Sequence, residues 1–154
     1  MLKILLAEDN PIDEAALIQY LKINLGTEFS YDNVKSCKEL LELLEKGSEY
    51  DIVILDHILE DEQSLKYIDK ITTRSKGAKI LVLSGQTDIS VCIQYLNAGV
   101  YAYLNKETNA FKNVVKNINE ILSKKKGDIT YFKIDKRIFY FGLAGLIIIV
   151  GIVL

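Results

Sequence analysis

The stretch Ile52-Val-Ile-Leu-Asp56, near the middle of the chain, is an uninterrupted aliphatic run that ends in a carboxylate. A short, β-branched run of this kind is typical of a strand that is buried on both faces of a parallel sheet. Two runs of similar character lie on either side of it along the chain, Lys3–Ala7 and Ile80–Leu83. The stretch therefore predicts a central strand with a polar residue at its carboxyl end.

Segments with apolar residues at helical spacing separate the apolar runs. Strands are predicted at 3–7, 29–34, 52–55, 80–83 and 102–104, and helices at 12–25, 37–46, 62–74, 89–97 and 111–122. Strands that alternate with helices form parallel sheets with crossover helices on both faces. The sequence thus predicts an α/β fold of the flavodoxin-like (βα)5 type, a doubly wound parallel sheet with strand order 2-1-3-4-5.

Charge is distributed unevenly over the 154 residues. Residues 1–123 carry 13 Lys and Arg against 19 Asp and Glu, a net charge of −6, whereas residues 124–154 carry six against two, a net charge of +4. Residues 138–154 hold no charged side chain. We therefore divide the chain into an α/β domain at 1–123, a basic linker at 124–137 and an apolar tail at 138–154. The overall charge of −2 argues against a nucleic-acid partner.

Carboxylates follow two of the predicted strands. Glu8 and Asp9 come directly after the first strand, and Asp56 ends the third. In the predicted strand order these two strands are neighbours, so the three side chains meet at one edge of the sheet. Three adjacent carboxylates repel one another and need a raised pKa or a cation. Hard oxygen ligands of this kind suit Mg²⁺.

Two further strand ends supply groups that suit a phosphoryl ligand. Lys106 follows the fifth strand and offers a positive charge, and Ser84 follows the fourth and offers a hydroxyl donor. All these residues belong to the same carboxyl edge of the sheet. The combination predicts a pocket for a metal ion and a phosphoryl group.

These strand-end motifs, in their order along the chain, resemble those of one protein family. The motifs are Glu8-Asp9, Ile52-Val-Ile-Leu-Asp56, Ser84-Gly85 and Tyr103-Leu-Asn-Lys106. With helices between them, residues 1–123 resemble the receiver domain of two-component response regulators. The resemblance implies Mg²⁺-dependent transfer of a phosphoryl group from a sensor histidine kinase or histidine phosphotransfer protein. It also implies a signalling domain that assists its own phosphorylation and dephosphorylation, and not an enzyme that turns over free substrates.

The resemblance also assigns roles residue by residue. It implies Asp56 as the phosphoacceptor, Lys106 and Ser84 as phosphoryl contacts, Ser84 and Tyr103 as the switch pair, and Glu8, Asp9, Asp56 and the backbone carbonyl of Ile58 as Mg²⁺ ligands. Three positions depart from the family pattern. Glu107 stands where the family usually has a proline after a cis peptide bond, and Glu60 and Ser64 stand where it tends to have Pro and Gly. We expect these changes to alter loop geometry and phosphoryl lifetime more than the acceptor chemistry.

Two other functions fit part of the pattern. A phosphohydrolase of the haloacid dehalogenase type also begins with an aspartate after an apolar strand, but it needs a second acid two residues later. Ile58 and Pro11 occupy that position after Asp56 and Asp9, so this function is unsupported. The other alternative is a receiver-like protein-binding module that works without phosphorylation. The set of Asp9, Asp56, Ser84 and Lys106 argues against it.

The apolar tail, residues 138–154, would span about 26 Å as a helix, against about 30 Å for a hydrocarbon core. Lys136 and Arg137 precede it, and such positive charge favours the cytoplasmic side. We therefore expect a transmembrane helix that anchors a cytoplasmic receiver to the inner membrane. A core helix or strand is the alternative, as is the front of a longer membrane protein. Glycines in the tail would allow two such helices to pack closely, so a dimer is a further alternative.

No DNA-binding module is apparent, so we expect output through contact with a downstream protein that the sequence does not identify.

Overall fold

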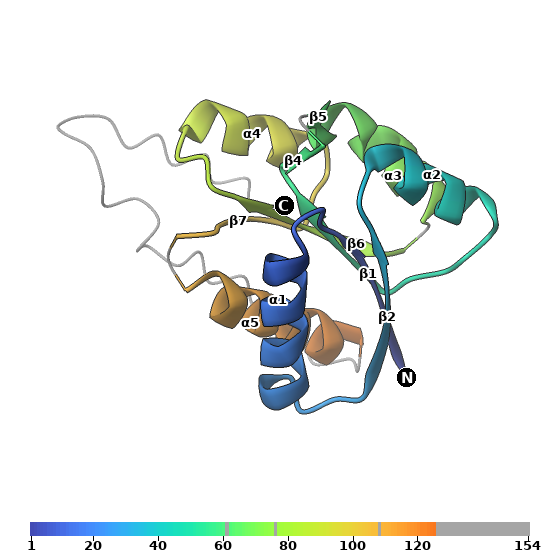
Figure 1. Ribbon diagram of the computed structural model, residues 1–154, viewed down its shortest axis with the longest axis vertical. Coiled ribbons are helices and arrows are strands. Elements are labelled where there is room, and N and C mark those ends of the chain that lie inside the picture. The colour runs from blue at the N-terminus through green and yellow to red at the C-terminus, as the bar shows by residue number, and fades with distance from the viewer. Residues whose placement is uncertain (61, 76, 108, 126–154) are drawn as a thin grey trace, which may run out of the picture.

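The structure is a computed structural model, and it describes residues 1–60, 62–75, 77–107 and 109–125. Strands and helices alternate along the chain (Figure 1). In chain order the elements are β1 (Leu2–Ala7), α1 (Pro11–Asn24), β2 (Phe29–Val34), α2 (Cys37–Glu45), β3 (Ile52–Asp56), β4 (Ile58–Leu59), β5 (Glu62–Gln63), the 3-10 helix η1 (Ser64–Tyr67), α3 (Ile68–Arg74), β6 (Lys79–Ser84), α4 (Ile89–Asn97), β7 (Ala102–Asn105) and α5 (Ala110–Lys125).

The main sheet has five parallel strands in the order β2-β1-β3-β6-β7. Counted by βα unit this is the predicted order 2-1-3-4-5, so the prediction of a flavodoxin-like fold is confirmed. The aliphatic run Ile52–Asp56 forms the central strand β3. In it, Ile54 pairs with Leu6 of β1 and with Leu81 of β6. This register brings the carboxyl ends of β1, β3 and β6 to the same edge.

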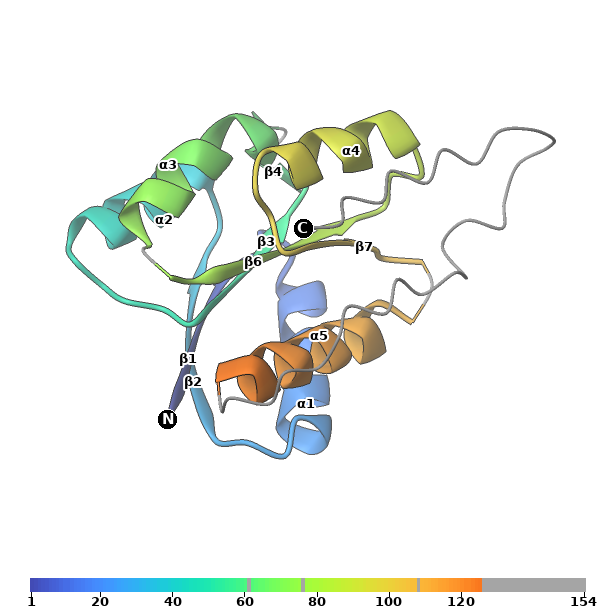
Figure 2. The ribbon, with the colours of Figure 1, turned by 180° about the vertical axis from the view of Figure 1, so that it is seen from behind.

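The helices form two layers, with α1 and α5 on one face of the sheet and α2, α3 and α4 on the other (Figures 1 and 2). Side chains of successive strand residues point to opposite faces. Ile52 and Ile54 accordingly pack with the apolar side chains of α1 and α5, whereas Val53 and Leu55 pack with those of α2, α3 and α4. Burial on both faces explains why this strand is apolar throughout.

The predicted helix at 62–74 is wrong in its first half. Residues 62 and 63 form β5, which pairs antiparallel with β4, and a 3-10 turn precedes α3. Glu60, whose φ of 48° lies in the left-handed region, helps the chain to reverse between the two short strands. The apolar spacing of three at Leu65, Ile68 and Ile71 could not reveal this difference. Both α and 3-10 helices place residues i and i+3 on nearly the same side.

The first two residues of the predicted linker, Lys124 and Lys125, belong to α5. Lysine is a good helix former, and its charge is favourable in the last turn of a helix. The remainder of the predicted linker and the predicted transmembrane helix at 138–154 lie outside the described residues. Within the part of the chain that the structure describes, no helix combines the length and the apolar character that crossing a membrane requires.

Candidate functional site

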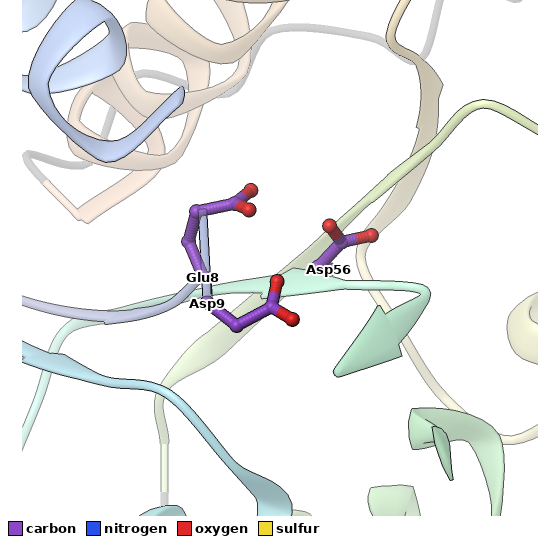
Figure 3. A group of neighbouring side chains, drawn as sticks. All are labelled: Glu8, Asp9 and Asp56. Carbon is purple, nitrogen blue, oxygen red and sulfur yellow. The ribbon is translucent and has the colours of Figure 1, made fainter. Parts of the chain in front are cut away.

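Three carboxylates meet at the carboxyl edge of the sheet (Figure 3). Glu8 and Asp9 directly follow β1, and Asp56 is the last residue of β3, which pairs with β1 up to Ala7 and Leu55. One oxygen from each carboxylate lies within 4.8 Å of the others. Glu8 is buried, whereas Asp9 and Asp56 are partly exposed. The strand order thus brings together the three acids that the sequence analysis selected.

Lys106 reaches these carboxylates from the end of β7. Its Nζ donates to Asp56 Oδ2 at 2.6 Å and to Glu8 Oε2 at 2.9 Å. It also lies 3.6 Å from Asp13 Oδ2 in the first turn of α1. Burial disfavours the ammonium, but the hydrogen bonds to Asp56 and Glu8 outweigh it and hold the pKa of Lys106 above its ordinary value. Lys106 is therefore a fixed positive charge at the Asp56 carboxylate.

The site carries a surplus of negative charge. Burial raises the pKa of Glu8, the hydrogen bond from Lys106 opposes that rise, and the nearby charge of Asp56 adds to it. Among the described residues, Lys106 forms ion pairs with three carboxylates, those of Glu8, Asp13 and Asp56, and Asp9 adds a fourth carboxylate beside Glu8 and Asp56. Closely spaced carboxylate oxygens with this excess charge fit a hard divalent cation.

Backbone N–H groups orient each of the three acids. Asn10 N donates to Glu8 Oε1 at 3.2 Å, and Glu60 N donates to Asp9 Oδ2 at 3.2 Å. Ile58 N donates to Asp56 Oδ1 at 3.3 Å, which places the Ile58 backbone beside the Asp56 carboxylate. The role of the Ile58 carbonyl as a metal ligand stays a prediction.

Ser84 and Tyr103 lie on the neighbouring strands β6 and β7. Ser84 is fully buried, and its Oγ accepts a hydrogen bond from Gln86 N at 2.9 Å. Tyr103 packs toward α4, whereas Tyr101 packs on the opposite face of the sheet, as their spacing in the sequence predicts. The Tyr103 hydroxyl is buried and has no hydrogen-bond partner among the described residues. Burial raises the pKa of Tyr103, and the nearby Ser84 hydroxyl opposes the shift.

The loop after Lys106 is built without the proline of the family pattern. The Lys106–Glu107 peptide bond is trans, as are the other peptide bonds of the described residues. Asn105 closes the turn, because its Oδ1 accepts a hydrogen bond from Glu107 N at 2.6 Å. The departure seen in the sequence therefore corresponds to a side-chain-capped turn.

Sequence reasoning missed four residues near this site. Asp13 lies on a helix whose orientation toward Lys106 only the packed fold establishes. The other three, His57, Ser64 and Tyr95, form a buried polar group behind Asp56. The serine at position 64, where the family tends to have glycine, is the one signal in the sequence that could have pointed to this group.

Comparison with known families gives one match that covers most of the chain. The family model of the response regulator receiver domain matches residues 4–123. A comparison with curated protein sequences finds no significant match.

Solved structures of similar fold come from several organisms. A two-component response regulator from Clostridium difficile has a TM-score of 0.71 and 22% identity, over 81% of this chain and 98% of that one. A receiver domain protein from Methanospirillum hungatei has a TM-score of 0.69 and 22% identity, over 83% and 98% of the two chains. A response regulator from Burkholderia pseudomallei, solved with a phosphorylated aspartic acid, a calcium ion and citrate, has a TM-score of 0.66 and 20% identity, over 84% and 76%. These likenesses establish the shared fold.

Proposed function

Because the chain belongs to the response regulator receiver domain family, we propose that Asp56 accepts a phosphoryl group from the phosphohistidine of a sensor histidine kinase or histidine phosphotransfer protein. The observation that carries this proposal is the placement of Lys106 Nζ 2.6 Å from Asp56 Oδ2, beside Glu8 and Asp9. A carboxylate next to a fixed cation and an acidic cluster is suited to receive a phosphoryl group.

The transfer exchanges one bond to phosphorus for another. A carboxylate oxygen of Asp56 attacks the phosphorus, a P–O bond forms, and the P–N bond to the donor histidine breaks. The electron pair of that bond leaves with the imidazole, which then takes up a proton. Lys106 is in place to bind the incoming phosphoryl oxygens, and the Ser84 hydroxyl can donate to one of them. Catalysis is then mostly positioning and charge neutralisation.

Mg²⁺ is the cofactor that this donor set supports best. Glu8, Asp9 and Asp56 would hold the ion together with the Ile58 carbonyl, with Glu8 acting directly or through a water. When bound, the ion would neutralise charge on the phosphoryl oxygens. Lys106 alone leaves the described cluster negative, so a phosphoryl dianion would otherwise meet net repulsion.

Removal of divalent cations should suppress the reaction. We expect EDTA to lower the rate at which acetyl phosphate labels the full-length chain by on the order of 100-fold, because the acidic cluster then repels the donor. Excess Mg²⁺ should restore the rate. The measurement is the initial rate of radiolabel incorporation, with the fold monitored by circular dichroism. An unchanged labelling rate in EDTA would contradict the proposed dependence on Mg²⁺.

Output would proceed by contact with a downstream protein. Tyr103 packs against Tyr95 of α4, on which Ile89, Ile93 and Leu96 are 68%, 51% and 47% exposed. Apolar side chains exposed together along one helix are suited to a protein partner. A change at the acceptor that alters the position of α4 would change this surface. A receiver-like module that binds without phosphorylation is the alternative, and phosphoryl labelling separates the two.

We further propose that residues 138–154 anchor the receiver to the cytoplasmic membrane. The support is the sequence, 17 residues without a charge that follow Lys136 and Arg137. Full-length protein should stay in the membrane pellet after carbonate extraction. Replacing Ile147 and Ile148 together by Arg should release it, because charge at the centre of a span is costly. Release of the unmodified chain by carbonate would refute the anchor.

A further inference from the structure

Behind the acceptor lies a buried polar group that the proposed phosphoryl chemistry does not use. Its members are His57, between β3 and β4, Ser64, at the start of η1, and Tyr95, on α4. They are 3%, 0% and 0% exposed. His57 Nδ1 lies 2.9 Å from the Tyr95 hydroxyl, which lies 2.9 Å from Ser64 Oγ. Ser64 Oγ in turn lies 2.7 Å from the backbone carbonyl of Asp56.

The backbone carbonyl of Asp56, at one end of the group, sets the direction of these hydrogen bonds. A carbonyl oxygen only accepts, so the single hydroxyl hydrogen of Ser64 goes to Asp56 O, with a longer contact of 3.2 Å to His57 O. With that hydrogen directed at Asp56 O, Tyr95 would donate to Ser64 Oγ, since its other acceptor, His57 O, lies farther away at 3.4 Å. This direction leaves no hydroxyl hydrogen for His57, so His57 Nδ1 would carry a hydrogen and donate to the Tyr95 hydroxyl.

Two properties of the side chains agree with this direction. Burial raises the pKa of Tyr95 to about 12, so its hydroxyl keeps its hydrogen at neutral pH. His57 Nε2 is buried without a hydrogen-bond partner among the described residues, as expected for the ring nitrogen that bears no hydrogen.

Tyr95 also packs α4 against the rest of the domain. It is the only fully buried side chain of that helix, within the described part of the chain. Its ring packs against those of His57 and Tyr103, with centroids 5.4 and 5.3 Å away. The same side chain thus anchors α4 and takes part in the hydrogen bonds that end on the Asp56 backbone.

We propose that His57, Tyr95 and Ser64 form a directional hydrogen-bond chain that holds the Asp56 backbone to α4 and couples phosphorylation of Asp56 to that helix. The coupling rests on the proposed function of Asp56. None of the three side chains contacts the acceptor carboxylate in the structure, so they are positioning residues. Ser84, on β6, is not a member of this hydrogen-bond chain, and Tyr103 meets it only through ring contacts with Tyr95 and His57.

The direction of the chain can be measured without phosphorylation. In ¹⁵N NMR spectra of the full-length protein at pH 8, we expect the His57 ring hydrogen on Nδ1 and an unprotonated Nε2. A ring hydrogen on Nε2 in place of Nδ1 would overturn the directional chain. This measurement tests the direction of the hydrogen-bond chain independently of whether Asp56 is the phosphoacceptor.

The coupling is tested with Tyr95→Phe, which removes the hydroxyl and keeps the ring. In the unmodified chain, phosphorylation with acetyl phosphate and Mg²⁺ should change amide hydrogen exchange in α4 by about threefold or more. In Tyr95→Phe we expect Asp56 still to be labelled, while the exchange of α4 no longer responds. Tyr50→Phe is the matched control, because Tyr50 is also buried and donates a 2.8 Å hydrogen bond to Asp32, away from the site.

A second variant guards against misfolding of the first. Ser64→Ala removes the hydrogen bond to the Asp56 carbonyl and leaves Tyr95 in place. The hydrogen exchange of α4 should therefore lose its response to phosphorylation in this variant too. A full α4 response in both variants would overturn the coupling. Failure of the unmodified chain to be labelled would count against the proposed function of Asp56 instead. The two failures are therefore distinguishable.

Discussion

Asp56→Asn should abolish phosphoryl labelling of the full-length chain. The substitution keeps the shape of the side chain but replaces the carboxylate nucleophile with an amide, which cannot form the acyl phosphate. We expect incorporation from radiolabelled acetyl phosphate with Mg²⁺ to fall by at least about 100-fold. Glu8, Asp9 and Asp13 remain in the variant, so residual labelling would report whether a neighbouring acid can substitute.

The matched control is Asp69→Asn, on the exposed surface of α3. It makes the same chemical change away from the site and should be labelled like the unmodified chain. Circular dichroism should show the same helix content for both variants. Labelling of Asp56→Asn at the rate of the control would contradict the assignment of the acceptor.

Lys106→Met should impair both phosphorylation and stability. It removes the ammonium that donates to Asp56 and Glu8. We expect the labelling rate to fall by about 10- to 100-fold, because the phosphoryl group loses a fixed positive charge. We also expect the free energy of unfolding to fall by about 2 kcal/mol. This is less than breaking a fully buried pair costs, since the Lys106 side chain is 26% exposed.

The stability loss of Lys106→Met should depend on pH. Burial already raises the pKa of Glu8, and losing the lysine should raise it further. A folded-state pKa above the unfolded value means that the folded protein holds the proton more tightly. Stability is then greatest below the unfolded pKa and declines as pH rises through the folded pKa. Urea unfolding without Mg²⁺ at several pH values measures this trend. Lys79, exposed at the opposite end of β6, provides the control, because the stability change caused by Lys79→Met relative to the unmodified chain should not vary with pH. The same pH dependence of the stability change in both variants would contradict this prediction.

Much of the fold could be predicted because its signals are local. The aliphatic run of β3 is buried on both faces, so its composition alone marks it as a central strand. Once the strand order is known, the ends of β1 and β3 must be neighbours, which places Glu8 and Asp9 near Asp56. The grouping of these acids therefore followed from topology and not from a local pattern.

The features that the sequence did not reveal depend on contacts between distant segments. The strands β4 and β5 have two residues each, too few for a periodic pattern. Asp13 approaches Lys106 only because the folded domain brings the first turn of α1 and the residue after β7 together. The contact between His57 Nδ1 and the Tyr95 hydroxyl joins residues 38 positions apart, and the sequence around neither residue indicates the other. Their burial and their distances are properties of the assembled domain.

The central claim is that Asp56 carries the phosphoryl group, and chemical identification of the modified residue tests it most directly. The full-length chain would be treated with acetyl phosphate and Mg²⁺, reduced with borohydride, digested and sequenced by tandem mass spectrometry. Borohydride converts an aspartyl phosphate to homoserine and leaves free carboxylates unchanged. We predict homoserine at position 56 and at no other aspartate. Reduction at Asp9 or Asp13 in its place, or an unmodified Asp56 in a labelled chain, would contradict the account.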